Sequence, residues 1–242
     1  MAKRKLRRVA FLTVSLAVSL ACGTFVANAR ESSEISDLKA KAAVGDVAAE
    51  LALGHSYDSG HGVKADAAEA AKWYEAAATH GNAEAENSIG SMYLRGEGVD
   101  QDGVKACEWF AKSAAQSYTP GVGNLGVCYD AGFGVPKDLA KAATLYEQAA
   151  NAGDLQSMMN IGVDYWRGEG VERDLAKAYM WLDLVRFYTQ ATGANRRIKW
   201  RSRGALDVLV KEMSAQERIR GEALVKEWDK ANRDKVQVSV LY

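Results

Sequence analysis

The chain has 242 residues, enough for one long domain or two short ones, and its 48% hydrophobic and 26% charged residues are typical of a folded soluble protein. Its 31 basic and 31 acidic residues balance, and removal of the first 29 residues would leave 26 basic against 31 acidic. This charge argues against a general nucleic-acid-binding protein. Only two prolines occur, which favours helices.

Residues 1–29 have the layout of a secretory signal peptide. Five basic residues lie among the first eight, an uncharged run spans Val9–Val26, and Ala27-Asn28-Ala29 supplies a small-x-small cleavage site. The run is barely long enough to span a bilayer. Ser19 stands where a lipoprotein signal would carry a large apolar residue before Cys22. We therefore predict a periplasmic or secreted protein, with an inner-membrane anchor or a lipoprotein as less favoured alternatives.

Residues 30–45 are predicted to form an N-terminal capping helix. Leu38 and Ala42 follow helical spacing, and the segment ends at Gly45, one repeat period before Gly81. A stacked array needs such a cap because its end unit would otherwise expose an apolar face.

The most informative pattern is a segment that occurs four times. Its copies read LGHSYDSGHGV (53–63), IGSMYLRGEGV (89–99), LGVCYDAGFGV (125–135) and IGVDYWRGEGV (161–171), with a period of 36 residues. Repetition at a fixed period of this size is typical of a stacked array. We predict four helix-turn-helix units, at 46–81, 82–117, 118–153 and 154–189.

The second unit illustrates the packing that we expect. Gly90 falls in mid-helix, where glycine costs about 1 kcal/mol relative to alanine. A repeated glycine there predicts close approach of another helix, with Tyr93 filling the space beside it. Gly96 and Gly98 then predict a tight turn, because glycine readily adopts positive φ.

A second helix is expected to follow this turn in each unit. Asp102 stands where an N-cap should satisfy the first free backbone N–H groups. Ala106, Trp109 and Phe110 then share one helical face, which predicts core packing rather than a ligand cage because every unit repeats small and large apolar residues there.

The combined pattern L-G-x-x-Y-x-x-G-x-G-V-x-x-D-x-x-x-A-x-x-W-Y-x-x-A-A resembles the Sel-one-like (SLR) repeat, a relative of the tetratricopeptide repeat. The resemblance covers residues 46–189 in four copies. It implies an all-α fold, a right-handed α/α superhelix whose surface binds proteins or peptides, commonly in bacterial signalling and envelope assembly. It implies no common chemistry.

Residues 190–235 depart from the repeat and are expected to close the array. Five basic residues surround Trp200 in the segment 196–203. A helix is predicted from Gly204 to Met213, and a capping box at Ser214–Glu217 opens a last helix. Residues 236–242 are expected to form a frayed tail.

Cys107 and Cys128 fall at similar heights on successive predicted helices, which would favour a disulfide in an oxidising compartment. The helical phase argues against it, because Cys128 points away from the inward positions Gly126 and Tyr129. We therefore interpret Cys128 as a repeat variant.

No catalytic, cofactor or metal site is predicted. His55, His61 and His80 occupy three different repeat positions, without a second cluster of ligands nearby. Ser36-x-x-Lys39 matches the nucleophile motif of penicillin-recognising enzymes, but their other motifs are missing.

Two sets of residues are candidates for partner binding. If the first helix of each unit lines the concave surface, its open stripe includes Arg95, Asn124, Asn160 and Arg167, which could bind peptide amides and carboxylates. That stripe also includes Met92 and Cys128. The second set is Arg196, Arg197, Trp200 and Arg201, which could dock on an anionic envelope surface or an acidic partner.

The predicted function is a secreted or periplasmic repeat scaffold, monomeric and not an enzyme. We expect it to bind a protein or peptide, to lack nucleic-acid binding, and to contact membrane only through the signal segment or the basic segment. It could regulate an envelope or signalling complex. One alternative is an envelope hydrolase of the penicillin-recognising type. Another is a membrane-tethered regulator of a sensor kinase or secretion system.

Overall fold

The structure, a computed structural model, describes residues 32–192 and 196–236. The expected signal peptide and residues 237–242 of the expected tail lie outside the described residues. All regular structure in the described ranges is helical, as predicted. The helices are α1 (Ser33–Ala42), α2 (Val47–Ser59), α3 (Ala67–Thr79), α4 (Ala83–Arg95), α5 (Gly103–Ala115), α6 (Thr119–Ala131), α7 (Leu139–Asn151), α8 (Leu155–Arg167), α9 (Leu175–Thr192), α10 (Arg196–Glu212), α11 (Ala215–Asn232) and the short 3-10 helix η1 (Arg233–Lys235).

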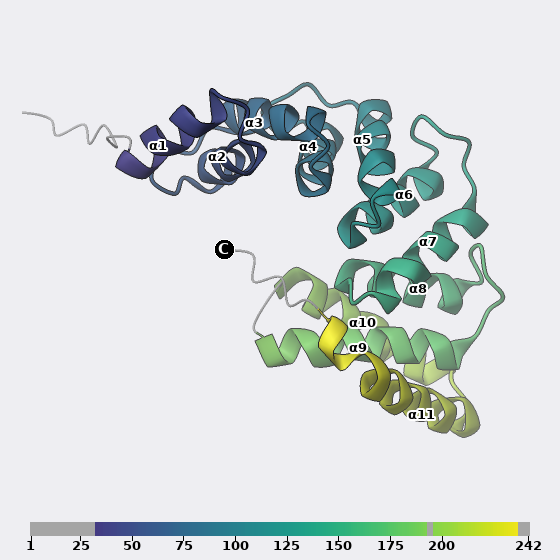
Figure 1. The fold of residues 1–242 in the computed structure, drawn as a ribbon. Helices are drawn as coiled ribbons and strands as arrows, with labels where there is room; N and C mark the ends of the chain where they lie inside the picture. The colour runs from purple at the N-terminus through teal and green to yellow at the C-terminus, as the bar shows by residue number, and fades with distance from the viewer. Residues whose placement is uncertain (1–31, 193–195, 237–242) are drawn as a thin grey trace, which may run out of the picture.

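After α1, the helices pack as sequential pairs that follow one another along an arc (Figure 1). We call α2, α4, α6 and α8 the A helices, and α3, α5, α7 and α9 the B helices. Each A helix packs on the B helix of its own unit and on the preceding helix, and α4 also contacts α6 directly. The A helices lie toward the inner side of the arc (Figure 1). The predicted solenoid of helix-turn-helix units is confirmed.

The turn between the A and B helices has the predicted construction. In the second unit, Gly96 and Gly98 have φ values of 69° and 71°, in the left-handed region that favours glycine. Asp102 then accepts hydrogen bonds from the backbone N–H groups of Val104 and Lys105, each at 3.0 Å. Equivalent aspartate caps occur at Asp66, Asp138 and Asp174.

The mid-helix glycine of each A helix lets the B helix of its own unit come close, as predicted. A methyl group on Gly90 would lie 2.8 Å from the Cε1 atom of Phe110. The prediction that Tyr93 fills this space is wrong, because the Phe110 ring occupies it. Tyr93 instead lies beneath Lys105, whose Nζ is 5.2 Å from the ring centroid. Equivalent close pairs are Gly54 with Tyr74, Gly126 with Tyr146, and Gly162 with Leu182.

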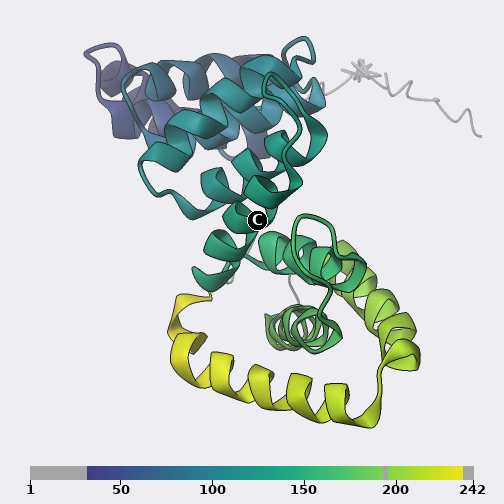
Figure 2. The same cartoon turned by 90° about the vertical axis from the view of Figure 1, so that its right-hand side faces the viewer.

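The C-terminal helices pack on α9, which extends the last unit to Thr192 (Figure 2). The capping box predicted for α11 is present: the backbone N–H of Glu217 donates to the Ser214 hydroxyl at 3.2 Å, and the backbone N–H of Ser214 donates to the Glu217 carboxylate at 2.7 Å. Val236, expected to begin a frayed tail, is buried beside Gly153.

Helix α10 begins at Arg196, eight residues before the predicted start at Gly204. Ile198, Ser202 and Leu206 recur at four-residue spacing and are all buried. This buried stripe continues the helix through the basic segment, because side chains four residues apart lie on one helical face.

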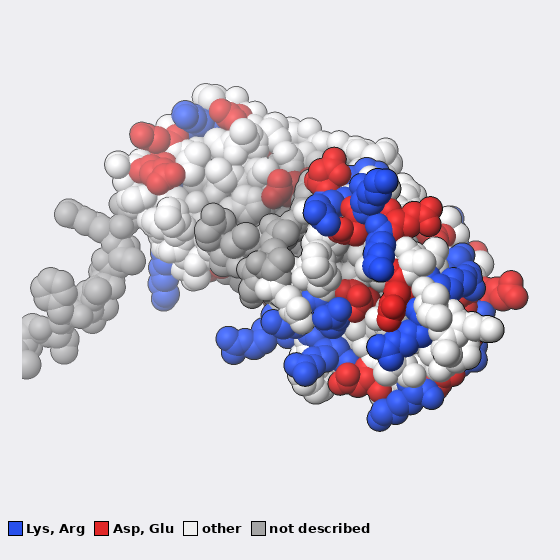
Figure 3. Space-filling model, turned by 90° about the horizontal axis from the view of Figure 1, so that it is seen from below, with Lys and Arg blue, Asp and Glu red and all other residues white. Residues whose placement is uncertain are grey.

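Charge is distributed unevenly along the chain. Lys and Arg side chains gather over the C-terminal helices, where Asp and Glu are interspersed with them (Figure 3). The sequence shows the same asymmetry, with 14 basic against 24 acidic residues in 30–188, and 12 against 7 in 189–242.

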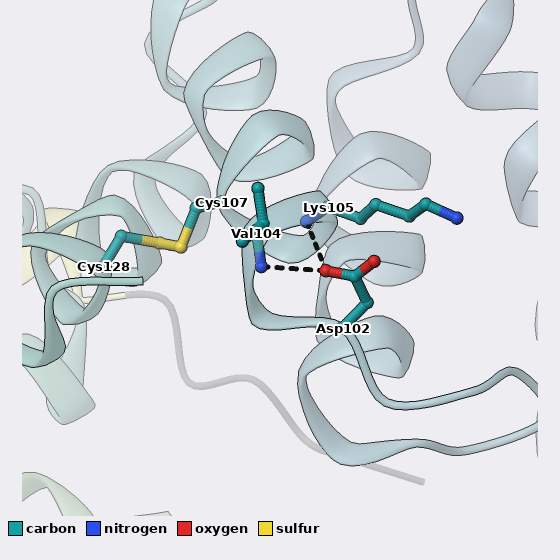
Figure 4. Close-up of a disulfide and its surroundings, with 5 residues drawn as sticks. All are labelled: Asp102, Val104, Lys105, Cys107 and Cys128. Atoms are coloured by element: carbon teal, nitrogen blue, oxygen red, sulfur yellow. Dashed lines mark hydrogen bonds between the residues drawn. A yellow bond between two sulfur atoms is a disulfide. The ribbon is translucent and has the colours of Figure 1, made fainter. Parts of the chain in front are cut away.

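A disulfide joins Cys107 on α5 to Cys128 on α6, with their Cα atoms 5.8 Å apart (Figure 4). The interpretation of Cys128 as a simple repeat variant is therefore wrong. The phase argument considered only the face of α6 that packs on α7. Helix α6 also packs on α5, the B helix of the preceding unit, and Cys128 belongs to that second face.

This disulfide lies at the junction with the weakest end caps. Ser117 has a φ of 60° where glycines end α1, α3 and α7, and a left-handed conformation costs a non-glycine residue about 1–2 kcal/mol. Tyr118, the N-cap of α6, makes no side-chain cap hydrogen bond, whereas Asp46, Asn82 and Asp154 cap the other A helices. The covalent bond joins α5 to α6 across this junction.

Replacement of both cysteines with serine should lower the free energy of unfolding by about 3 kcal/mol, the effect expected for closure of a loop of this length. Urea denaturation measures the change through the midpoint and slope. Reduced wild-type protein is the control and should unfold like the double variant. Equal stability of oxidised and reduced wild type would contradict the prediction.

Gly90→Ala should lower the free energy of unfolding by about 1–3 kcal/mol, because the added methyl group would meet Phe110. Gly204→Ala is the matched control: a methyl group there meets no atom within 4 Å, and the variant should gain about 0.5–1 kcal/mol through helix propensity. Thermal unfolding compares the two. Stabilisation by Gly90→Ala would disprove the close-packing role.

Candidate partner-binding site

Arg95 and Arg167 are the last residues of α4 and α8, and both are exposed. Each pairs with the glutamate two residues later: Arg95 Nη2 lies 2.8 Å from Glu97 Oε2, and Arg167 Nη1 lies 3.8 Å from Glu169 Oε1. Surface pairs of this kind contribute about 0–1 kcal/mol, so a partner's carboxylate could replace either glutamate. The two arginines belong to units two and four and do not converge on one point.

The two predicted asparagines are half-buried on α6 and α8. Asn124 Nδ2 donates to Asn87 Oδ1 at 2.8 Å and so links α6 to α4. Asn160 Oδ1 accepts a hydrogen bond from Gln156 Nε2 at 2.9 Å. A side-chain amide offers two donors and an oxygen with two lone pairs, so each keeps capacity beyond these bonds. The repeat pattern could not identify Asn87, because Gly123 holds its place in the next unit.

One position of the predicted stripe is closed. Met92 and Cys128 occupy it in units two and three, and both are buried. The expectation that these side chains are open is wrong because each A helix has two packing faces, one toward its own B helix and one toward the preceding unit.

In unit four the same position holds Asp164, which is half-buried. Burial raises the pKa of this carboxyl to about 7, with further increases from Asp130 on α6 and from Glu169, and a decrease from Arg167. Burial, Asp130 and Asp164 also raise the pKa of the Tyr146 hydroxyl, to which Asn160 is hydrogen-bonded. The inner face therefore has an acidic end near Asn160. Alignment of the repeats could have revealed it, because Asp164 is a carboxyl at a repeat position where Met92 and Cys128 are buried.

The other predicted set lies together at the start of α10. Arg196, Arg197, Trp200 and Arg201 are all exposed there. They belong to a helix outside the four repeat pairs, so they form a surface distinct from the side chains of α4, α6 and α8.

A cleft of about 550 Å³ lies between the unit-four turn and α11. Its two arginines are already paired: Arg220 Nη2 lies 2.7 Å from Asp174 Oδ2, and Arg173 Nη2 lies 2.9 Å from Glu212 Oε2. Lys177 Nζ donates to the Tyr165 hydroxyl at 3.2 Å. The cleft therefore indicates no particular class of ligand.

Ser36 and Lys39 both lie on α1, but their side chains are engaged separately. The Ser36 hydroxyl donates to the carbonyl of Ser32 at 3.5 Å, and Lys39 Nζ lies 5.6 Å from the centroid of the Tyr57 ring. This arrangement does not show the serine activated by the lysine.

Two histidines connect helices within the first repeats. His55 Nε2 lies 3.1 Å from Glu84 Oε1, and its Nδ1 lies 3.0 Å from the hydroxyl of the buried Tyr74. His80 Nδ1 lies 2.9 Å from the buried carboxylate of Glu50. Across the described residues, no group of three or more potential ligands could hold a metal ion.

These contacts define an all-helical repeat solenoid whose inner face is lined by the A helices. The Sel1 repeat pattern matches residues 47–82, 83–118, 123–154 and 155–184. The match covers more than half of the chain, so this protein belongs to the Sel1 repeat family.

Two solved structures have similar folds. One is c5321 of uropathogenic Escherichia coli, a protective antigen displaying an SLR fold, with a TM-score of 0.74, 27% identity, and coverage of 84% of this chain and 42% of that one. The chain thus spans less than half of that relative. The other is a Sel1 repeat protein from Oxalobacter formigenes, with a TM-score of 0.60, 27% identity, and coverage of 81% and 78%. No curated protein matches the chain.

The Cys107–Cys128 disulfide indicates an oxidising, extracytoplasmic location. None of the helices in the described ranges is both long and apolar enough to cross a membrane.

The raised pKa of Asp164 predicts a pH-dependent stability. The folded chain holds this proton from about pH 4 to about pH 7 whereas the unfolded chain releases it, so the contribution of Asp164 to stability falls as pH rises through that window. At pH 8, Asp164→Asn should be more stable than wild type by about 1–2 kcal/mol, a value reduced for the partial exposure of the group.

Urea unfolding of both proteins at pH 5 and pH 8 tests this, because the difference between them cancels other titrating groups. An advantage of the variant that is equal at both pH values would contradict the assignment to Asp164.

Proposed function

We propose that this protein is a periplasmic or secreted scaffold that binds an extended segment of a protein partner along the inner face of the A helices. The segment would run across α4, α6 and α8. The family membership and the disulfide support a scaffold outside the cytoplasm.

The observation that carries this proposal is the set of side-chain amides on neighbouring A helices. Asn87 and Asn124 bridge α4 and α6, and Asn160 follows on α8. Amides that keep donors and acceptors suit an extended backbone, which has unpaired N–H and C=O groups. Asp130 and Asp164 at the far end would favour a partner with a basic side chain there.

We infer a non-catalytic role. The separate engagement of Ser36 and Lys39 supports this inference over the penicillin-recognising hydrolase. Hydrolysis of nitrocefin that Ser36→Ala abolishes would instead favour the hydrolase.

A photo-crosslinking residue at Ser91, on α4 beside Asn87, should capture an envelope protein because this position faces the proposed path. The same residue at Thr144, exposed on the B helix α7, is the control and should capture little. Covalent adducts are measured on gels of cells irradiated in culture.

The amides provide the second part of the test. Asn124→Ala with Asn160→Ala should reduce the Ser91 adduct several-fold, whereas Gln148→Ala, which removes an exposed amide from α7, should leave it unchanged. Equal capture at Ser91 and Thr144, or an adduct that is insensitive to the two asparagines, would reject the inner face as the binding surface.

A further inference from the structure

The first two turns of α10 carry an unusual outward face. Ile198 and Ser202 hold these turns against the rest of the protein. On the opposite side, Trp200 is 77% exposed, although large aromatic side chains are generally well buried. An indole in this position contributes nothing to the core and remains available for an external contact.

Cations surround this ring. Arg196 and Arg197 lie one turn before Trp200, and Arg203 lies one turn after it, so all three flank the indole on the helix surface. Arg201 is exposed at the edge of the same face. We call Arg196, Arg197, Trp200, Arg201 and Arg203 the α10 basic face.

The arginines of this face differ from those nearby. Within the described residues, no carboxylate forms an ion pair with any of the four. By contrast, Arg218, Arg220 and Arg233 on α11 and η1, which follow α10 in the chain, pair with Glu222, Asp174 and Asp229. Ion pairs among the described residues therefore leave the positive charge of the α10 basic face unneutralised.

Gly204 lies one turn after Trp200 and adds to this argument. It occupies the interior of α10, where glycine is unfavourable, and a methyl group there would meet no atom within 4 Å. Packing within the chain does not require it. The helix surface one turn after Trp200 is therefore open.

We propose that the α10 basic face docks this protein on an anionic lipid bilayer surface. Arginines bind the phosphate groups, and Trp200 enters the interfacial region, where amphipathic aromatic rings are favoured. The inference goes beyond the proposed scaffold function, because it depends on none of the inner-face residues.

The size and chemistry of the face favour lipid over an acidic protein. Five residues on one side of a single helix fall well short of the roughly 800 Å² that each partner contributes to a standard protein interface. Lipid headgroups need no shaped partner surface, because each cation near an anionic membrane adds independently, by about fivefold in affinity. An exposed tryptophan among cations is typical of an interfacial helix.

The test is co-sedimentation of the full protein, as purified from cells, with phosphatidylcholine vesicles that contain or lack phosphatidylglycerol. The quantity compared is the ratio of the two affinities, which cancels binding that does not depend on anionic lipid. Arg196→Ala, Arg197→Ala and Arg203→Ala together should lower this ratio about 100-fold and weaken its dependence on salt.

The charge-matched control removes three other exposed cations, through Lys137→Ala, Lys226→Ala and Lys230→Ala. Its affinity ratio should fall by less than a tenth as much as that of the arginine variant. Trp200→Ala should weaken binding at every salt concentration. Its intrinsic fluorescence should also lack the blue shift that wild-type protein shows with anionic vesicles.

An equal fall of the affinity ratio in the two triple variants would show that only net charge matters, and it would overturn the assignment to α10. Absence of phosphatidylglycerol-dependent binding by the wild type would overturn the lipid as the occupant. Retention of the Ser91 photo-crosslink in the α10 variant would show that the scaffold function is independent. Circular dichroism of each variant verifies that it is folded.

Discussion

The close contact between each mid-helix glycine and the side chain of its B helix is the constraint on which the array depends. At Gly90 the backbone of α4 approaches the ring of Phe110 with no room for a methyl group. Tyr74, Tyr146 and Leu182 repeat the contact in the other units. This contact fixes the helix pair, and the glycine turn and aspartate cap then join its two members. A unit built in this way can be stacked, because its remaining faces are free to meet the neighbouring units.

Stacking gives every A helix a second packing face, and one position on that face serves different chemistries. Met92 fills it with an apolar side chain, Cys128 with a covalent link, and Asp164 with a carboxyl whose pKa is raised by burial and by Asp130. The position in the repeat is the same, but the disulfide at Cys128 stabilises the fold, whereas the buried carboxyl of Asp164 destabilises it at high pH. Such variation within a fixed frame lets a repeat protein differ from its relatives without a change of fold.

The sequence predicts the all-helical units, the turns, the aspartate caps and the capping box of α11, because local backbone chemistry determines each of them. It does not predict the disulfide or the burial of Met92, since these depend on how one unit meets the next. The same limit explains why Asn87 was missed as a partner of Asn124. The start of α10 was misplaced because the basic residues concealed the buried stripe of Ile198, Ser202 and Leu206. Among the candidate residues, the sequence placed Arg95, Arg167, Asn124 and Asn160 on the correct helices but could not show how they pair.

The disulfide also determines how a solenoid of this kind would transmit force. A pull on the two ends of the chain passes along the backbone to Cys107, crosses the sulfur–sulfur bond, and continues from Cys128. Residues 108–127 lie in the loop that this bond bypasses, and they include Ser117 and Tyr118. The junction with the poorest caps is thus removed from the mechanical path. Under tension, the array would yield first at an interface that has no covalent link.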